Sequence, residues 1–302
     1  MTKGLFHGLC AFPMTPANAE GHVDTSTLGK IIDRLVEVEV DSIGLLGSTG
    51  IYAYLNRDER RGAVRTASEA IGGRVPLMVG IGALRTDAAV LLARDAADEG
   101  ADGLFMAPVA YTPLTEEEVY RHYATVACAT DLPLCIYNNP STTGFVFTGD
   151  LLSRLAALPN IAAVKMPLPG KVSLETELSG LRGKPAGALA IGYSGDWGMA
   201  DAMLAGADAF YSVSGGILPR EVLSMMRAAQ AGDDVEVRRI DRAFQPLWTL
   251  FREFGSLRIV YVIARQLGLC DVAPPLPVLP LQDGDQRRVR DALAVITDLK
   301  VA

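Results

Sequence analysis

The sequence predicts an α/β fold, specifically a TIM (β/α)8 barrel with a C-terminal helical extension. Apolar runs alternate with amphipathic helical patterns eight times between residues 1 and 231. The runs are nearly continuous in apolar residues, which is typical of parallel strands buried on both faces. Eight such units over about 230 residues match the length and repeat of this barrel.

The predicted strands and helices follow one another in strict order. The apolar runs span residues 5–12, 42–46, 75–81, 103–107, 133–137, 161–166, 188–191 and 209–213. The helical stretches span residues 24–40, 56–71, 86–99, 115–130, 148–158, 173–181, 197–205 and 219–230. Each run has strand length, and each helical stretch carries apolar residues at helical spacing.

Local signals mark several ends of these elements. Asp24 is a favoured N-cap residue for the first helix. The acidic run 116–118 suits the positive N-terminal end of the fourth helix. Gly72 and Gly73 end the second helix, because glycine readily adopts the left-handed conformation found at helix ends.

The C-terminal part has a different pattern. Apolar residues recur at helical spacing from Phe244 to Ile263, and a proline-rich turn follows at 274–280. We expect residues 1–231 to form the barrel domain and residues 232–302 to form a helical segment beside it.

Composition argues against several classes of protein. The 302 residues are 49% hydrophobic and carry a net charge of −7, with no basic block of the kind that binds nucleic acid. No apolar run reaches transmembrane length, and the first residues lack a signal-peptide pattern. The cysteines and histidines show no metal-ligand spacing. We therefore expect a cytoplasmic protein without a nucleic-acid partner, membrane contact or bound metal.

Lys165 is the one lysine that lies inside an apolar strand. Burial disfavours the charged ammonium, and a neutral amine is the form that attacks a carbonyl group. The side chain could instead reach solvent or pair with a carboxylate. The position alone leaves both interpretations open.

Further candidates follow from a rule of the barrel: active sites lie where the strands end at their carboxyl side. Ser48 and Thr49 lie in the Gly-Ser-Thr-Gly turn that closes the second strand, and Tyr137 is the last residue of the fifth strand. With Lys165 they suit imine chemistry, in which an amine attacks a ketone and the iminium draws electrons from the adjacent carbon. An alternative is a phosphate cradle at 212–216, since barrels often bind phosphate there.

The motifs together resemble one family. Gly-Ser-Thr-Gly at 47–50, Tyr-Asn-Asn-Pro-Ser-Thr-Thr-Gly at 137–144, Val-Lys at 164–165 and Ser-Gly-Asp at 194–196 resemble the dihydrodipicolinate synthase and N-acetylneuraminate lyase family. The resemblance covers nearly the whole chain in the right order. It implies a TIM barrel, a homotetramer, and class I aldolase chemistry on pyruvate or a related 2-oxo acid without metal or organic cofactor.

The resemblance also implies roles for individual residues. Lys165 would form the Schiff base, and Tyr137 would shuttle protons. Ser48 and Thr49 would bind the carboxylate of the 2-oxo acid, with Thr49 also relaying protons to Tyr137. Tyr211 falls where family members line the pocket with a backbone carbonyl.

Three positions depart from the synthase pattern. Thr142 stands where an arginine grips the second substrate, Ala110 where a relay tyrosine enters a neighbouring site, and Ile51 where a glutamate is usual. Tyr111 could replace the relay tyrosine from one residue along. These departures argue against the lysine-biosynthetic synthase and for an aldolase or dehydratase that acts on another 2-oxo acid, with an aldehyde or sugar acid as substrate. We expect the distal groups of that 2-oxo acid to meet the side chains Thr142, Thr143, Tyr111, Tyr193 and Trp197.

The sequence therefore leaves four candidate functions. The first is a lyase or aldolase that makes or breaks a bond beside the imine carbon. The second is a 2-keto-3-deoxy sugar acid dehydratase of the same family. The others are a catalytically silent 2-oxo acid binding protein, motivated by Ala110, and a phosphate-binding barrel enzyme.

Overall fold

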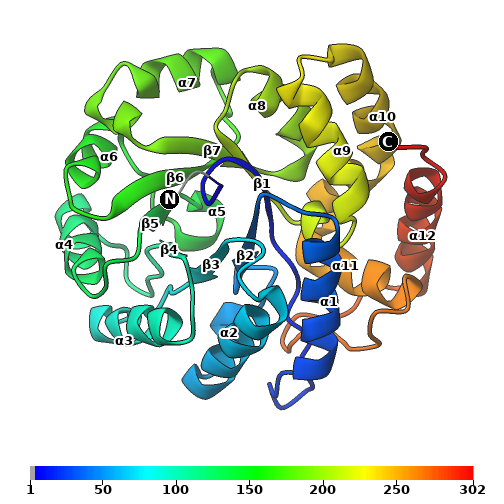
Figure 1. The fold of residues 1–302 in the computed structure, drawn as a ribbon, viewed down its shortest axis with the longest axis horizontal. Coiled ribbons are helices and arrows are strands. Elements are labelled where there is room, and N and C mark those ends of the chain that lie inside the picture. Colours follow the sequence, from blue (N-terminus) through cyan, green and yellow to red (C-terminus); the bar gives the residue numbers. More distant parts are fainter. Residues whose placement is uncertain (1–3, 302) are drawn as a thin grey trace.

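The computed structural model describes residues 4–301, and it confirms the predicted barrel. Eight parallel strands close in the order β1 to β8, with helices around them (Figure 1). The strands are β1 Gly8–Ala11, β2 Ser42–Leu45, β3 Leu77–Gly80, β4 Gly103–Met106, β5 Leu134–Tyr137, β6 Ile161–Pro167, β7 Ala190–Ser194 and β8 Ala209–Ser212. The helices that follow the strands are α1 Thr25–Glu37, α2 Arg57–Ile71, α3 Thr86–Asp98, α4 Glu116–Ala127, α6 Gly149–Ala156, α7 Leu174–Arg182, α8 Met199–Leu204 and α9 Pro219–Gln230.

Short helices occupy several loops that sequence patterns did not resolve. A four-residue helix, α5 Pro140–Thr143, follows β5 directly. The 3-10 turns are η1 Tyr52–Tyr54, η2 Pro185–Ala188, η3 Asp196–Gly198 and η4 Ser214–Gly216. Because η2 occupies the residues just before it, β7 begins and ends later than the predicted run 188–191.

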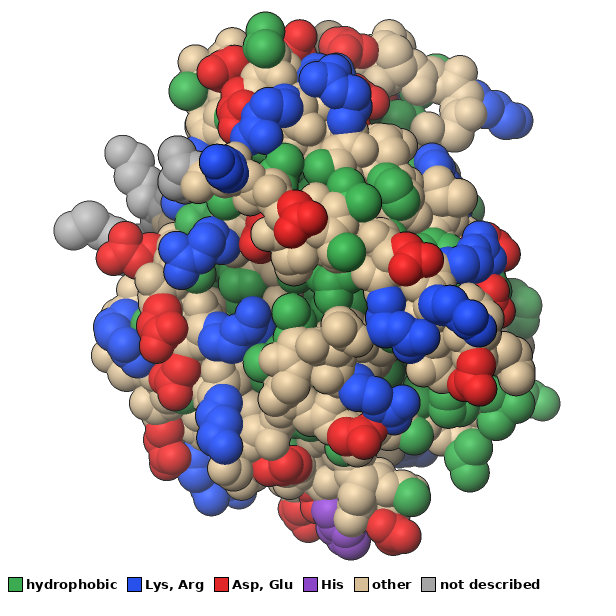
Figure 2. All heavy atoms as spheres, turned by 90° about the vertical axis from the view of Figure 1, so that its right-hand side faces the viewer, with side chains coloured by type: hydrophobic (Ala, Val, Ile, Leu, Met, Phe, Trp, Pro, Cys, Tyr) green, Lys and Arg blue, Asp and Glu red, His purple; other side chains and the backbone are tan. Residues whose placement is uncertain are grey.

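The C-terminal extension consists of three helices, α10 Asp234–Phe254, α11 Ser256–Gln266 and α12 Asp283–Thr297. They pack together beside α9, and Figure 1 shows them along one flank of the barrel. Figure 2 shows this flank, where basic and acidic side chains lie intermixed.

Among the described helices, none is long and apolar enough to cross a membrane. The division at residue 231 remains a prediction.

Two apolar layers hold the barrel together. The larger fills the space between strands and helices, and the smaller fills the barrel interior. The interior layer is unusually aromatic near the carboxyl ends of the strands, where it contains Phe12, Phe105, Tyr137 and Tyr211. Successive strand residues face opposite sides, so residues two apart in a strand share a layer.

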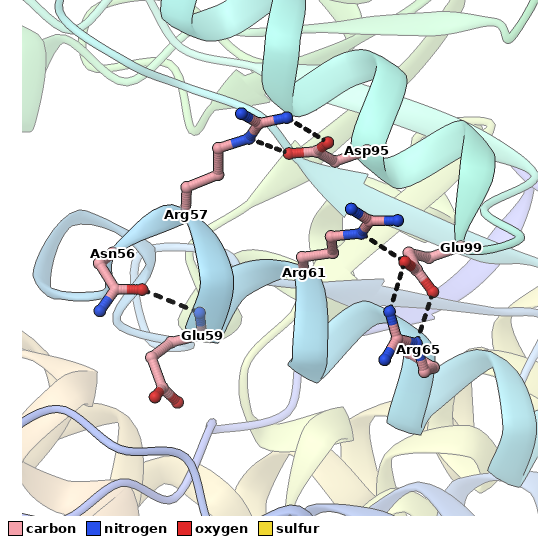
Figure 3. A network of polar contacts seen from close by, with 7 residues as sticks. All are labelled: Asn56, Arg57, Glu59, Arg61, Arg65, Asp95 and Glu99. Carbon is pink, nitrogen blue, oxygen red and sulfur yellow. Dashed lines mark hydrogen bonds and ion pairs between the residues drawn. The ribbon is translucent and has the colours of Figure 1, made fainter.

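An ion-pair network joins α2 to α3 (Figure 3). Arg57 pairs with Asp95 at 2.6 Å, while Arg61 and Arg65 both reach Glu99, at 2.5 and 2.8 Å. The hydrogen bonds from Arg65 and then Arg61 lower the pKa of Glu99 from 4.5 to about 2. A carboxyl whose pKa falls on folding adds stability above its unfolded pKa, and that stability is lost as pH falls towards the folded value.

Glu99→Gln should therefore lower the free energy of unfolding by about 1 kcal/mol at pH 7, the scale of a favourable surface network. The difference from wild type should shrink as the pH falls below 4.5, because the wild-type carboxyl then begins to protonate in the unfolded state. Urea unfolding across a pH series measures both effects. Glu69→Gln, which changes an exposed carboxylate on α2, is the control. A pH-independent difference would contradict this account.

Candidate functional site

The Lys165 amine lies inside an aromatic enclosure at the mouth of the barrel. Lys165 sits in β6, is 4% exposed, and pairs in register with Tyr137 of β5. Its Nζ lies 4.1 Å from the ring centroid of Phe12, 4.4 Å from that of Tyr137 and 5.5 Å from that of Tyr211. Aromatic faces attract a cation, so the enclosure accommodates the charged and the neutral amine.

The enclosure supplies no anion to the amine. Among residues 4–301 no carboxylate forms an ion pair with Lys165. Two thiols, Cys10 and Cys135, lie in the same interior layer, and burial raises the pKa of each to about 12. Both thiols are therefore neutral near pH 7. The sequence left open that the Lys165 side chain reaches solvent or pairs with a carboxylate. Both of these interpretations are wrong, because the amine is buried among aromatic rings.

The Gly-Ser-Thr-Gly turn after β2 has a strained backbone. Leu46 and Ile51, which flank it, have φ values of 59° and 52°. Left-handed conformations are costly for such bulky residues, and they persist at functional sites where the surroundings enforce them. Here a Cβ on Gly80 would lie 2.1 Å from the Leu46 carbonyl oxygen, so close packing fixes the turn.

Ser48 lies nearest to the tyrosine within this turn. Its Oγ is 3.5 Å from the Tyr137 phenol oxygen. Thr49 is 5% exposed, and no hydrogen bond from it to Tyr137 is found in the described structure. The structure thus brings the turn, Tyr137 and Lys165 together, with the Ser48 hydroxyl in contact with the phenol.

Asn139 belongs to the same site, although the sequence analysis gave it no role beyond its place in the 137–144 motif. Its Nδ2 donates to the Tyr137 phenol oxygen at 3.0 Å and to Thr142 Oγ1 at 2.8 Å. Ser141 Oγ donates to Asn139 Oδ1 at 2.9 Å, and Thr143 Oγ1 donates to the Asn139 backbone carbonyl at 3.0 Å. Helix α5 therefore carries a polar, uncharged network that ends on the phenol.

Tyr111 and Thr143 meet at a neighbouring hollow. They line a cavity of about 120 Å³ with Ala110, Pro113 and Phe145, among other residues. Tyr111 is 95% exposed. Lys165 and Tyr137 do not line this cavity, so within one chain it adjoins the lysine site without being part of it.

Tyr211 and Tyr193 lie in different layers of the barrel. The Tyr211 ring, and not only its backbone, lies in the barrel interior, where its phenol is 3.6 Å from Cys135 Sγ. The expectation that Tyr193 faces the mouth is wrong: it is fully buried in the layer between barrel and helices. Trp197, by contrast, is 39% exposed at the end of β7.

The loop after β8 is not arranged as a phosphate cradle. Asp196 is 3% exposed and accepts hydrogen bonds from Ser212 Oγ at 2.5 Å, from Ser214 N at 2.9 Å and from Ser214 Oγ. Gly215 N donates to Ser212 Oγ at 2.8 Å. The donors that would hold a phosphate are already used, and a buried carboxylate would repel it. This geometry argues against the phosphate-binding alternative.

The groups gathered at the mouth are an amine, a phenol, hydroxyls and a turn of backbone amides. Within residues 4–301, no three His, Cys, Asp or Glu side chains are grouped as metal ligands.

Comparison with known proteins places this site in context. The model of the dihydrodipicolinate synthetase family matches residues 5–296. The 4-hydroxy-tetrahydrodipicolinate synthase of Alkalilimnicola ehrlichii is 32% identical over 297 residues, covering 98% of this chain and 100% of that protein.

Two solved structures are similar in fold. The crystal structure of dihydrodipicolinate synthase from Agrobacterium tumefaciens is 55% identical, with a TM-score of 0.96 over 98% of this chain and 100% of that one. The chloride-inhibited dihydrodipicolinate synthase from Acinetobacter baumannii, solved in complex with pyruvate, is 27% identical, with a TM-score of 0.86 over 97% and 100% of the two chains.

Proposed function

This chain belongs to the dihydrodipicolinate synthetase family, and within that family we propose that it is a class I aldolase-type enzyme whose Lys165 forms an imine with pyruvate. The observation that carries the proposal is the buried Lys165 amine beside Tyr137, whose phenol in turn contacts Ser48, with no ion-pair partner for the amine among residues 4–301. The pyruvate complex of a relative supports the choice of 2-oxo acid.

The geometry supports a complete sequence of steps. The Lys165 amine attacks the carbonyl carbon of pyruvate, and the carbonyl oxygen leaves as water. The iminium then draws electrons from the neighbouring C–H bond, and a proton leaves the methyl carbon to give an enamine. The enamine carbon attacks an aldehyde, and water finally hydrolyses the imine and frees the amine. Tyr137 would carry the protons, and the Ser48–Thr49 turn would hold the carboxylate.

The first test uses pyruvate and borohydride, which reduces an iminium to a stable amine. We expect the intact mass to rise by one reduced pyruvate, and a digest to place the adduct on Lys165. An adduct on another lysine would overturn the residue assignment. No adduct with pyruvate or with other 2-oxo acids would favour a silent binder.

The residues around Thr142 favour a second candidate function. Thr142 holds the position of the arginine in the synthase pattern, and its hydroxyl contacts Asn139, an uncharged partner. This network suits hydroxyl groups better than a carboxylate, which favours a 2-keto-3-deoxy sugar acid dehydratase as the alternative. Release of water from such an acid, without condensation of pyruvate with any aldehyde, would support the dehydratase.

Asn139→Leu should slow exchange of the pyruvate methyl protons with heavy water by about tenfold, the effect of losing one hydrogen bond to the phenol. This exchange reports enamine formation, needs no second substrate, and is followed by NMR. Ser141→Ala is the matched control, because it removes a contact to Asn139 while sparing the donor to Tyr137. Equal rates in wild type and Asn139→Leu would make Asn139 structural only.

We further propose that the enzyme is a cytoplasmic homotetramer, as the family resemblance implies, with residues 232–302 as a segment distinct from the barrel. The 95% exposure of Tyr111, beside a hollow that contains Thr143, supports a second copy on that surface. Sedimentation equilibrium tests the assembly, and a monomer at micromolar concentration would contradict it.

A further inference from the structure

Arg60 places a buried cation near the carboxyl ends of β2 and β3. It lies close to the start of α2 and is 6% exposed. Its Nη2 donates to the Gly80 carbonyl at 2.7 Å and its Nη1 to the Gly82 carbonyl at 3.1 Å, at and just beyond the end of β3. Arginine side chains are rarely buried to this degree unless a carboxylate pairs with them.

The structure supplies no such carboxylate. Among residues 4–301, no carboxylate forms an ion pair with Arg60, and its Nε has no hydrogen-bond partner. Asp95, the carboxylate whose field reaches Arg60, accepts two hydrogen bonds from Arg57 instead, at 2.6 and 2.7 Å (Figure 3). Burial lowers the pKa of Arg60 to about 10, which still leaves the guanidinium charged at pH 7. Its positive charge is therefore offset mainly by two carbonyl dipoles.

The guanidinium borders the Gly-Ser-Thr-Gly turn on both sides. Before the turn, the Leu46 carbonyl packs against Gly80, where a Cβ would lie 2.1 Å from the carbonyl oxygen. After the turn, Tyr52 lies under the guanidinium, whose central carbon is 5.4 Å from the ring centroid. Burial raises the pKa of Tyr52 to about 12, so its phenol is neutral near pH 7. An anion held in the turn between Leu46 and Tyr52 would thus lie close to the buried charge.

We propose that Arg60 is a specificity-determining residue, whose unpaired charge draws the carboxylate of the 2-oxo acid to the Ser48–Thr49 turn and so favours carboxylates over neutral ketones at Lys165. A charge in the protein interior acts over several ångströms because little water screens it. The carboxylate in turn offsets the desolvation cost of the buried guanidinium. The inference rests on the proposed function, because it takes the turn as the place of the carboxylate.

A role in packing alone predicts a different result. In that case Arg60 would only join α2 to the end of β3 through the Gly80 and Gly82 carbonyls. Its loss would then loosen the neighbouring turn and slow the capture of charged and neutral ketones alike. The two roles are therefore separated by a ketone that has the shape of pyruvate but no charge.

The test measures the capture of pyruvate and of its neutral amide, pyruvamide, at limiting concentration, trapped with cyanoborohydride and followed by intact mass. Arg60→Met should slow the capture of pyruvate by about tenfold, the scale for loss of one poorly screened charge, and change that of pyruvamide by less than about twofold. In pyruvate proton exchange, the half-saturating concentration should rise by about tenfold while the maximal rate stays unchanged. Arg60→Gln, which is neutral and keeps N–H donors for the carbonyls, serves if the methionine variant fails to fold.

Two further variants complete the design. Arg60→Lys keeps the charge but not the planar fork, so it should capture pyruvate at close to the wild-type rate. Arg61→Met is the matched control, because it removes an arginine from the same helix whose side chain is 44% exposed and paired with Glu99, which Arg65 also binds. Its capture of both ketones should equal that of wild type.

Three results would overturn the inference. They are pyruvate capture at the wild-type rate by a folded neutral Arg60 variant, an equal loss for both ketones, and a loss in Arg60→Lys as large as in Arg60→Met. If pyruvamide reacts too slowly for comparison, the lysine variant decides between charge and packing. Absence of any pyruvate adduct on wild-type Lys165 would overturn the proposed function as well, whereas a normal adduct with unchanged preference would overturn this inference alone.

Discussion

Lys165→Ala is expected to abolish both the trapped pyruvate adduct and the pyruvate proton exchange above the uncatalysed background. In the proposed function the Lys165 amine is the group that joins the 2-oxo acid to the protein, and among residues 4–301 no other lysine lies over the Tyr137 ring. The readouts are intact mass after borohydride treatment and NMR of the methyl signal in heavy water. This is the largest effect that the site predicts.

Two variants separate loss of chemistry from loss of fold. Lys165→Met keeps an unbranched side chain of similar length inside the aromatic enclosure, so the barrel should stay folded while capture is lost. Lys165→Met should therefore keep the thermal stability of wild type more closely than Lys165→Ala, which leaves a cavity in the packed interior. Lys184→Ala is the control, because the Lys184 side chain is about half exposed. This variant should capture pyruvate normally. Capture by Lys165→Met at a different lysine would sink the assignment.

The buried position of Lys165 at the barrel mouth was predictable from the sequence because its signal is local. A lysine inside an apolar run is rare enough to suggest function, and strand order places its end at the barrel mouth. The partners Tyr137, Ser48 and Thr49 follow from the same rule, since each stands where a strand ends. The carboxyl ends of all the parallel strands lie at the same mouth of the barrel. The rule that active sites lie at this mouth therefore locates residues that are far apart in the chain.

Phe12 and Asn139 were not predictable in this way. Phe12 reads as an ordinary apolar residue before a proline, and only the closed barrel shows that its ring crosses the interior to Lys165. The contact of Asn139 with the phenol depends on the short helix α5, which begins at a proline directly after β5. Nothing in the spacing of the motif specifies the direction of that side chain.

The error at Tyr193 has a simple cause. The predicted strand ended at residue 191, which left Tyr193 beyond the strand and free to face the mouth. In the structure β7 runs to Ser194, so Gly192 faces the interior, where a Cβ would lie 2.6 Å from the Tyr211 ring. Its neighbour Tyr193 must then face outward to the helices. A shift of a few residues in a strand end thus reverses the layer to which a side chain belongs.

Tyr137→Phe should slow pyruvate proton exchange by about 10²-fold, the usual scale for loss of acid–base help, while the ring remains in place over the amine. The phenol oxygen is the only atom removed, and it is the one that contacts Ser48 and Asn139. The remaining ring keeps its contact with Lys165, so the reduced pyruvate adduct should still form with long incubation. Persistent capture with lost exchange would assign proton transfer, rather than binding, to Tyr137.

Tyr193→Phe is the matched control for this prediction, because it removes a phenol oxygen from a buried strand tyrosine that faces the helices. Its exchange rate should equal that of wild type. Equal rates in all three proteins would mean that Tyr137 only packs, and that protons reach the enamine carbon through Ser48 or water. A large loss in Tyr137→Phe alone would assign the proton transfer to the Tyr137 phenol, which contacts Ser48 and Asn139 and whose ring lies beside the amine proposed to form the imine.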